Sequence, residues 1–319
     1  MNETEWDPEM LASHQAYLEA SARLPPIVLA RPFGPQRAIN DALAMTLAID
    51  GDGGPPMADT ADRWVAARGR RILCRVHRPT TDGPLPVLVY FHGGGWVWSS
   101  VDTHDRLTRE YAADAGCAVV SVDYALSPEA VFPQALEECA AVIRWIGAHG
   151  AEWGLDATRI ALGGDSAGGN LALGAALLLR DSGGPALRGI LALYPVCDAD
   201  FRRPSYRRFG AGGYFLTEEK MRFYWNVYAP EEATRLNPLA APLRANLAGL
   251  PPTLVQLAEL DVLHDEGVAL ADRLREAGVS TTLEEVPGVI HGFIRASARV
   301  AKARRAIVTG AVWLRAALP

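Results

Sequence analysis

The sequence predicts an α/β fold in which a mostly parallel central sheet is flanked by helices. From residue 71 onward, short apolar runs rich in β-branched residues alternate with longer amphipathic segments, the order that parallel crossover connections produce. These short runs are apolar along most of their length, as strands buried on both faces must be. The expected strands cover residues 72–76, 87–91, 118–123, 160–163, 189–194, 253–258 and 281–286.

Six helices are expected around this sheet. Four of them cover residues 133–149, 169–180, 265–277 and about 296–317. Near the N-terminus, Asp7 followed by Pro8 is typical of a helix start, and apolar residues recur at helical spacing until Pro25 and Pro26. A second helical pattern covers roughly residues 36–49 and ends in the breaker-rich loop 51–56.

The composition of the 319 residues is that of a globular chain and excludes several classes of protein. A net charge of −6 provides no basic field for a phosphate backbone, so nucleic acid is not an expected partner. The longest apolar run, residues 171–179, is about half of the ~20 residues that cross a bilayer, so no membrane span is expected. The first ten residues are acidic where a secretory signal is basic, which predicts a cytoplasmic protein.

The four cysteines are expected to be reduced thiols of the core. Cys74, Cys117, Cys139 and Cys197 form no CxxC pair and no cluster with histidine at zinc-ligand spacing. The sequence therefore predicts no metal site and no organic cofactor.

A serine in the motif GGDSAGGN, residues 163–170, is the strongest candidate for a nucleophile. GxSxG follows an apolar strand and opens a helix rich in alanine and leucine, the context in which a nucleophile elbow occurs. The glycines allow the sharp turn that projects Ser166 clear of the sheet, and the helix N-terminus favours a developing negative charge.

A second glycine-rich motif, His92-Gly93-Gly94-Gly95, directly follows the expected strand 87–91. Glycines allow backbone N–H groups to approach a substrate oxygen that a Cβ atom would crowd. The predicted oxyanion hole consists of the N–H groups of Gly93, Gly94 and Ala167.

A base and an acid are expected after Ser166, in the order acid and then histidine. Only His264 and His291 follow the serine; His291 lies in a loop after a strand, whereas His264 starts a helix and is interpreted as structural. Asp261, just beyond the expected strand 253–258, is the predicted acid, and Glu259 is the alternative.

The segment between the last strands is unusually aromatic. Residues 198–230 contain nine of the chain's 25 aromatic residues, so this stretch must pack on other parts of the protein. Trp96, Tyr194 and Phe215 are candidates for an apolar substrate pocket, although such aromatics equally pack on one another. The basic cluster 202–208 is interpreted as a solvated face, with attraction of an anionic substrate as the alternative.

Together these segments resemble the hormone-sensitive lipase family of α/β-hydrolases, bacterial family IV, in particular esterases with a GDSAG elbow. The resemblance rests on HGGGW at 92–96, DYALSPE at 123–129, GDSAGGN at 164–170, LYPVCD at 193–198, ELDVLHDEG at 259–267 and HGF at 291–293. Two departures are Val262, where the family usually has proline after its acid, and a DYALSPE segment where the family usually reads DYRLAPE.

The resemblance implies the α/β-hydrolase fold as a single catalytic domain, residues 1–319, with a helical cap. The cap would be formed by about residues 1–50 and about 198–235. It also implies a serine carboxylesterase that hydrolyses short- to medium-chain acyl esters. A homodimer that pairs through an exposed sheet edge is compatible with this family.

The expected reaction passes through an acyl-enzyme formed on a small-molecule ester. His291 takes the proton of Ser166, Asp261 holds the imidazole, and water then releases the acid. Two alternatives stay open: an amidase or aryl-formamidase with the same three residues, and a non-catalytic ligand receptor on the same fold.

Overall fold

The computed structural model describes residues 5–26, 29, 33–48 and 53–319. The chain folds around one eight-stranded sheet with the strand order β1-β2-β4-β3-β5-β6-β7-β8. The strands are β1 (Asp59–Ala67), β2 (Arg70–Arg78), β3 (Leu85–Phe91), β4 (Ala118–Asp123), β5 (Leu155–Asp165), β6 (Leu187–Leu193), β7 (Thr253–Leu260) and β8 (Thr281–Ile290).

The predicted mostly parallel sheet is confirmed. Strands β3 to β8 pair in parallel, and only β2 runs antiparallel to its neighbours β1 and β4. Each expected strand is present, and β1 is an additional one. The sequence did not indicate β1 because it lies at the sheet edge and exposes Asp62, Arg63 and Trp64, so no apolar run marks it.

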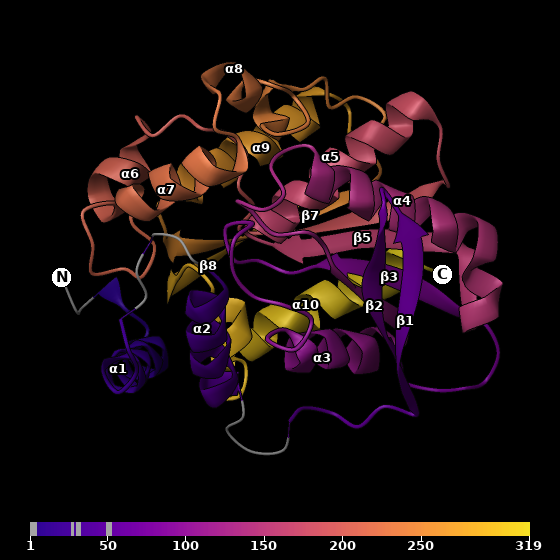
Figure 1. The fold of residues 1–319 in the computed structure, drawn as a ribbon, viewed down its shortest axis with the longest axis horizontal. Helices are drawn as coiled ribbons and strands as arrows, with labels where there is room; N and C mark the ends of the chain where they lie inside the picture. The colour runs from indigo at the N-terminus through magenta and orange to yellow at the C-terminus, as the bar shows by residue number, and fades with distance from the viewer. Residues whose placement is uncertain (1–4, 27–28, 30–32, 49–52) are drawn as a thin grey trace.

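Helices cover both faces of the sheet. Helices α3 and α10 pack together on one face, and α4, α5 and α9 lie on the other (Figure 1). Helices α1, α2, α6 and α7 gather on one side of the sheet, near β8. The helices are α1 (Pro8–Ala22), α2 (Phe33–Ala48), α3 (Asp105–Ala115), α4 (Gln134–His149), α5 (Ala167–Ser182), α6 (Pro204–Phe209), α7 (Glu218–Tyr228), α8 (Glu232–Arg235), α9 (His264–Glu276) and α10 (Ala301–Ala317), with short 3-10 turns η2 (Gly150–Trp153), η3 (Pro242–Arg244) and η4 (Phe293–Ala296).

The predicted start of the first helix is confirmed. The Asp7 side chain accepts hydrogen bonds from the N–H groups of Glu9 and Met10 at 3.0 and 3.1 Å, which caps α1. Helix α2 begins three residues before the expected range. Residue 49 of that range, residues 51 and 52 of the expected loop, and parts of the expected cap (1–4, 27–28, 30–32 and 49–50) lie outside the described residues.

Helix α3 is present although the sequence gave no expectation for it. Five of its eleven residues, DRLTREYAADA, carry charge, and its apolar contacts come from Leu107, Tyr111, Ala112 and Ala115 on one face. A narrow apolar face of this kind is easily missed, because polar residues surround it in the sequence.

The core lies between the sheet and its helices. Strand β3 is central, and from Val87 to Phe91 its residues are fully buried. Cys74, Cys117, Cys139 and Cys197 are all free and buried, which confirms the predicted reduced thiols. None of the helices in the described part of the chain is long and apolar enough to span a bilayer.

The aromatic segment packs as predicted, on itself and on the N-terminal helices. Tyr206, Phe209, Trp225 and Tyr228 are buried. Before α1, the ring of Trp6 stacks on Tyr214 with 5.6 Å between centroids, and the first residue of α2, Phe33, lies 6.0 Å from Phe223. The two parts of the expected cap are therefore in contact, although about 150 residues of sequence lie between them.

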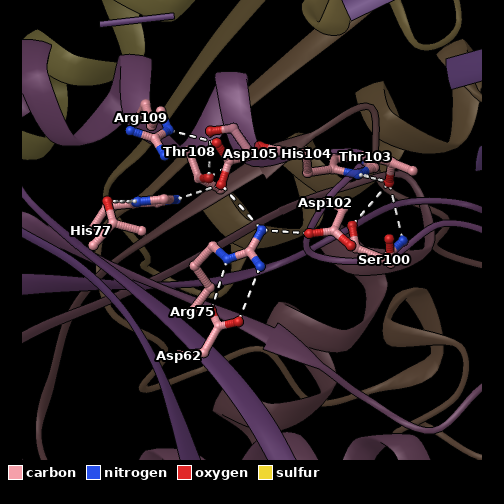
Figure 2. A network of polar contacts seen from close by, with 11 residues as sticks. Asp62, Arg75, His77, Ser100, Asp102, Thr103, His104, Asp105, Thr108 and Arg109 are labelled. Carbon is pink, nitrogen blue, oxygen red and sulfur yellow. Dashed lines mark hydrogen bonds and ion pairs between the residues drawn. The ribbon is translucent and has the colours of Figure 1, made fainter. Parts of the chain in front are cut away.

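A network of charged side chains ties the antiparallel edge of the sheet to α3 (Figure 2). Arg75 on β2 binds Asp62 on β1 at 2.8 Å and Asp102 at 2.6 Å, and it lies 3.3 Å from Asp105 at the start of α3. Burial raises the pKa of Asp105, but hydrogen bonds from His77 and Arg109 outweigh it and hold the pKa below its ordinary value. The Arg75 side chain is only 17% exposed, so solvent screens these contacts weakly.

Replacing Arg75 by methionine should lower the free energy of unfolding by about 1.5 kcal/mol, because three carboxylates lose their shared partner. Urea denaturation measures this change. Arg202→Met is the matched control: Arg202 pairs with Asp200, but its side chain is 89% exposed, and its loss should cost much less than that of Arg75. Equal effects of the two substitutions would contradict a stabilising role for the network.

Candidate active site

Ser166 lies in the sharp turn between β5 and α5, as predicted. Its backbone has φ 56° and ψ −118°, a conformation that residues other than glycine rarely adopt. Three backbone hydrogen bonds hold it there: its N–H donates to Leu193 at 2.8 Å, and its carbonyl accepts from Asn170 at 3.1 Å and Val196 at 3.2 Å. Strain of this kind persists where the surroundings over-determine the turn.

The glycines of the motif are required by close packing of the turn against the end of β3. A Cβ atom on Gly168 would lie 1.9 Å from the carbonyl oxygen of Phe91. A Cβ atom on Gly164 would lie 2.4 Å from the carbonyl carbon of Gly168. Any side chain at either position would therefore push the serine turn away from β3.

Ser166, His291 and Asp261 lie in one hydrogen-bonded chain, as the sequence predicts. Ser166 Oγ is 2.9 Å from His291 Nε2, and His291 Nδ1 is 2.6 Å from Asp261 Oδ2. All three residues are buried and come from the carboxyl ends of β5, β7 and β8. A carboxylate only accepts hydrogen bonds, so Nδ1 carries the proton and Nε2 is left to accept the serine proton.

The second oxygen of Asp261 is also occupied, since its Oδ1 accepts the N–H of Leu263 at 3.0 Å. The alternative acid, Glu259, is exposed and accepts the N–H of Gly288 at 2.8 Å, so it does not reach the histidine. His264 lies 2.7 Å from Glu285, which agrees with the structural role expected for it.

Two carboxylates after Asp261 hold the segment that follows β6. They lie in the first turn of α9, and each also accepts a distant backbone N–H. Asp265 binds Ser205 at 2.8 Å, and Glu266 binds Cys197 at 2.7 Å. Burial raises the pKa of Glu266 well above its ordinary value.

The expected role of Gly93 in the oxyanion hole is wrong. Its N–H donates to Asp165 Oδ1 at 2.9 Å and is not free for a substrate oxygen. The next two glycines have positive φ angles, 120° at Gly94 and 59° at Gly95. In the described part of the chain, the N–H groups of Gly94, Gly95 and Ala167 form no hydrogen bond.

Asp165 is a buried anion that the sequence analysis missed. It accepts the Tyr90 hydroxyl at 2.8 Å as well as the Gly93 N–H, and it lies 3.3 Å from His104 Nε2. Burial raises its pKa, but His104 outweighs that effect, and the pKa lies well below the ordinary value. Burial in turn lowers the pKa of His104. The position of Asp165 inside the serine motif was the only signal in the sequence.

The three candidate pocket aromatics occupy different places. Trp96 is fully buried and stacks on Tyr228 at 4.0 Å, so its expected contact with substrate is wrong. Tyr194 packs its ring 4.8 Å from that of His291 and does not line the cavity described below. Only Phe215 lines that cavity.

A cavity of about 140 Å³ opens beside His291. Its walls come from α1, α2, the start of α3, Phe215 and the segment after β8, and they include His14, Tyr17 and Leu43. The basic cluster 202–208 does not line it; Arg202 pairs with Asp200 at 2.8 Å, in agreement with a solvated face. Among the described residues, no group of three or more His, Cys, Asp or Glu is arranged to hold a metal ion.

The fold and the serine–histidine–aspartate chain together define the class of α/β hydrolases with a nucleophile elbow. Residues 88–295 match the family described as alpha/beta hydrolase fold, and the chain belongs to that family. The predicted fold is thereby confirmed.

Similar proteins include curated enzymes and solved structures. The chain is 40% identical to carboxylesterase NlhH of Mycobacterium tuberculosis (strain ATCC 25618 / H37Rv), over 75% of this chain and 76% of that protein. It is 39% identical to ethyl acetate hydrolase of Pseudomonas putida, over 75% and 77%. A thermostable esterase from Pseudomonas putida ECU1011 superposes with a TM-score of 0.88 at 36% identity, over 98% and 99% of the two chains. The resemblance to esterases of this superfamily is confirmed.

Replacing Asp165 by asparagine should destabilise the protein by about 2 kcal/mol at pH 7, because a buried hydrogen-bonded charge is lost. The folded-state pKa lies below the ordinary 3.8, so this stabilisation is present above about pH 4 and is lost as the pH falls through the lowered pKa. Urea denaturation between pH 3 and 8 should show a constant difference above pH 5 that shrinks below pH 4.

The matched control for this substitution is Asp181→Asn, at an aspartate whose side chain is 60% exposed. It should change stability much less than Asp165→Asn does, because solvent screens an exposed charge. A difference between wild type and Asp165→Asn that grew on acidification would contradict an ionised Asp165.

Proposed function

We propose that this chain is a serine carboxylesterase that hydrolyses short- to medium-chain acyl esters through an acyl-enzyme. The observation that carries the proposal is the hydrogen-bonded chain from Ser166 through His291 to Asp261, with contacts of 2.9 and 2.6 Å. The printed names of the relatives, a carboxylesterase and an ethyl acetate hydrolase, support the same reaction class. A non-catalytic receptor would have no need of this geometry.

In the first step His291 accepts the proton of Ser166 as the serine oxygen attacks the ester carbonyl. Asp261 stabilises the imidazolium that forms and keeps the ring in the required orientation. The imidazolium then protonates the leaving alcohol. Water, activated by the same histidine, attacks the acyl-enzyme and releases the carboxylic acid.

The oxyanion formed in both steps would bind the N–H groups of Gly94, Gly95 and Ala167. This revised set replaces Gly93, whose N–H binds Asp165. Ala167 is the first residue of α5, so the positive end of the helix dipole adds to its N–H. Such donors each contribute about 3 kcal/mol to transition-state stabilisation where they have been measured.

We further propose that residues 1–319 form one catalytic domain whose cap consists of about residues 1–50 and 198–235. The stacking of Trp6 on Tyr214 and the ion pair of Glu5 with Arg208 at 3.3 Å support this, since each joins the two parts of the cap. The cavity of about 140 Å³ beside His291 is close to the ~150 Å³ that holds a benzene molecule, which favours short acyl groups.

A cytoplasmic location and a homodimer are part of this proposal. Four free, buried cysteines are typical of a reducing compartment. Strands β1 and β8 are the edges of the sheet at which two copies would pair.

Ser166→Ala should lower kcat for 4-nitrophenyl butyrate by at least about 10⁴-fold, because no other nucleophile replaces the hydroxyl. Release of 4-nitrophenolate measures the rate, and circular dichroism checks the fold. Ser182→Ala, at an exposed serine near the other end of the same helix, should keep wild-type turnover. Wild-type turnover by Ser166→Ala would refute the assignment of Ser166 as the nucleophile.

Faster cleavage of 4-nitroacetanilide than of 4-nitrophenyl acetate would favour the amidase alternative.

Asp261→Asn should lower kcat for the same ester by about 10³- to 10⁴-fold, since an amide does not stabilise the imidazolium or enforce the required tautomer. The matched control is Glu259→Gln, two residues earlier on the same strand end. Glu259 binds only the backbone of Gly288 within the described chain, so kcat should change less than threefold. Comparable losses in the two variants would contradict the assignment of Asp261.

A further inference from the structure

The cavity beside His291 has an electrostatic character that ester hydrolysis does not explain. Three arginines line it, and no aspartate or glutamate is among its described lining residues. The other lining residues are two histidines, His14 and His291, and residues whose side chains carry no charge. A reaction on neutral esters requires no positive charge in this position.

Arg295 is the arginine whose charge is available to a ligand. It lies in η4, four residues after His291, and is half-buried. Within the described part of the chain its guanidinium makes no hydrogen bond and no ion pair within 4.0 Å. Arg106, on another wall, differs because it binds Glu110 at 3.2 Å.

The charge of Arg295 acts to lower the pKa of two carboxylates that it does not bind, Asp165 and Asp41. Asp165 directs its Oδ1 to the Tyr90 hydroxyl, the Gly93 N–H and His104 rather than to Arg295. Asp41 on α2 accepts a hydrogen bond from Asn40 at 3.2 Å, and its carboxylate lies more than 4.0 Å from the guanidinium of Arg295. A half-buried guanidinium with no direct partner in the described chain is poorly compensated, and a bidentate carboxylate is the ligand that matches its geometry.

We propose that Arg295 binds a carboxylate group of the substrate, so that the preferred esters carry a negative charge next to the scissile bond. This inference rests on the proposed esterase function, because the cavity opens at His291. The small volume of about 140 Å³ limits the charged part to a few carbon atoms. The substrate class is therefore short esters with a carboxylate on either the acyl or the alcohol side.

Two pairs of esters test the proposal, each with an anionic member and a neutral amide of the same size. Monomethyl glutarate and methyl 5-amino-5-oxopentanoate place the group on the acyl side. Acetoxyacetate and acetoxyacetamide place it on the alcohol side. The measured quantity is kcat/KM for each ester, followed by chromatography of the products.

Arg295→Met should lower the anionic-to-neutral ratio of kcat/KM at least tenfold in one pair, and that pair identifies the side that binds. Arg295→Lys should restore part of the ratio, because the charge remains. Arg202→Met removes the same charge outside the cavity and should leave both ratios unchanged. An equal loss on anionic and neutral esters, or an unchanged ratio in both pairs, would overturn the proposal.

A binding measurement separates this proposal from the proposed function. Calorimetry with glutarate on Ser166→Ala should detect binding that Arg295→Met abolishes in the same background, whereas neutral glutaramide should not bind. If the wild type hydrolyses no ester but glutarate binding depends on Arg295, the esterase function fails and the anion site stands. If neutral esters are hydrolysed but glutarate does not bind, the anion site fails and the esterase function stands.

Discussion

The close approach of the β5–α5 turn to the end of β3 is the constraint on which the rest of the site depends. Gly168 leaves no room for a Cβ atom beside the carbonyl of Phe91, so the turn and the strand meet backbone to backbone. This contact places the glycine loop that follows Phe91 beside the serine turn. It also holds Ser166 at its positive φ, because the turn has no space in which to relax. The serine turn and the glycine loop are thus parts of one packed unit.

Two buried carboxylates hold different parts of this site in place. Asp165 points back from the turn to Tyr90 and Gly93, and so fixes the loop against the strand. Asp261 points to His291 and fixes the imidazole. Each carboxylate accepts hydrogen bonds from protein donors before any substrate arrives, which is what preorganisation requires. Because Asp165 takes the first N–H of the loop, the donors left for an oxyanion lie further along, at Gly94 and Gly95.

The sequence predicted those features that depend on residues close to one another along the chain. Strands, the serine turn and the order of acid and base each leave a short pattern, and the structure brings Ser166, Asp261 and His291 together. Strand β1 and helix α3 were missed because mixed charge conceals their buried faces. The roles expected for Gly93 and Trp96 were wrong because each depends on a partner distant in sequence, Asp165 and Tyr228. No spacing rule encodes such partners.

The elements that form the cavity differ from those that carry Ser166, Asp261 and His291. Ser166, Asp261 and His291 lie at strand ends, whereas α1, α2 and Phe215 form walls of the cavity outside the sheet. Helix α2 is nevertheless tied to the sheet: Arg37 donates to the carbonyls of Val97 and Ser127, both at 2.8 Å. Substitutions on the inner faces of α1 and α2 can therefore alter the cavity while the backbone contacts that hold the serine turn stay in place. These helices and Arg295 thus determine the shape and charge of the cavity, whereas the strand ends hold the hydrogen-bonded chain from Ser166 to Asp261.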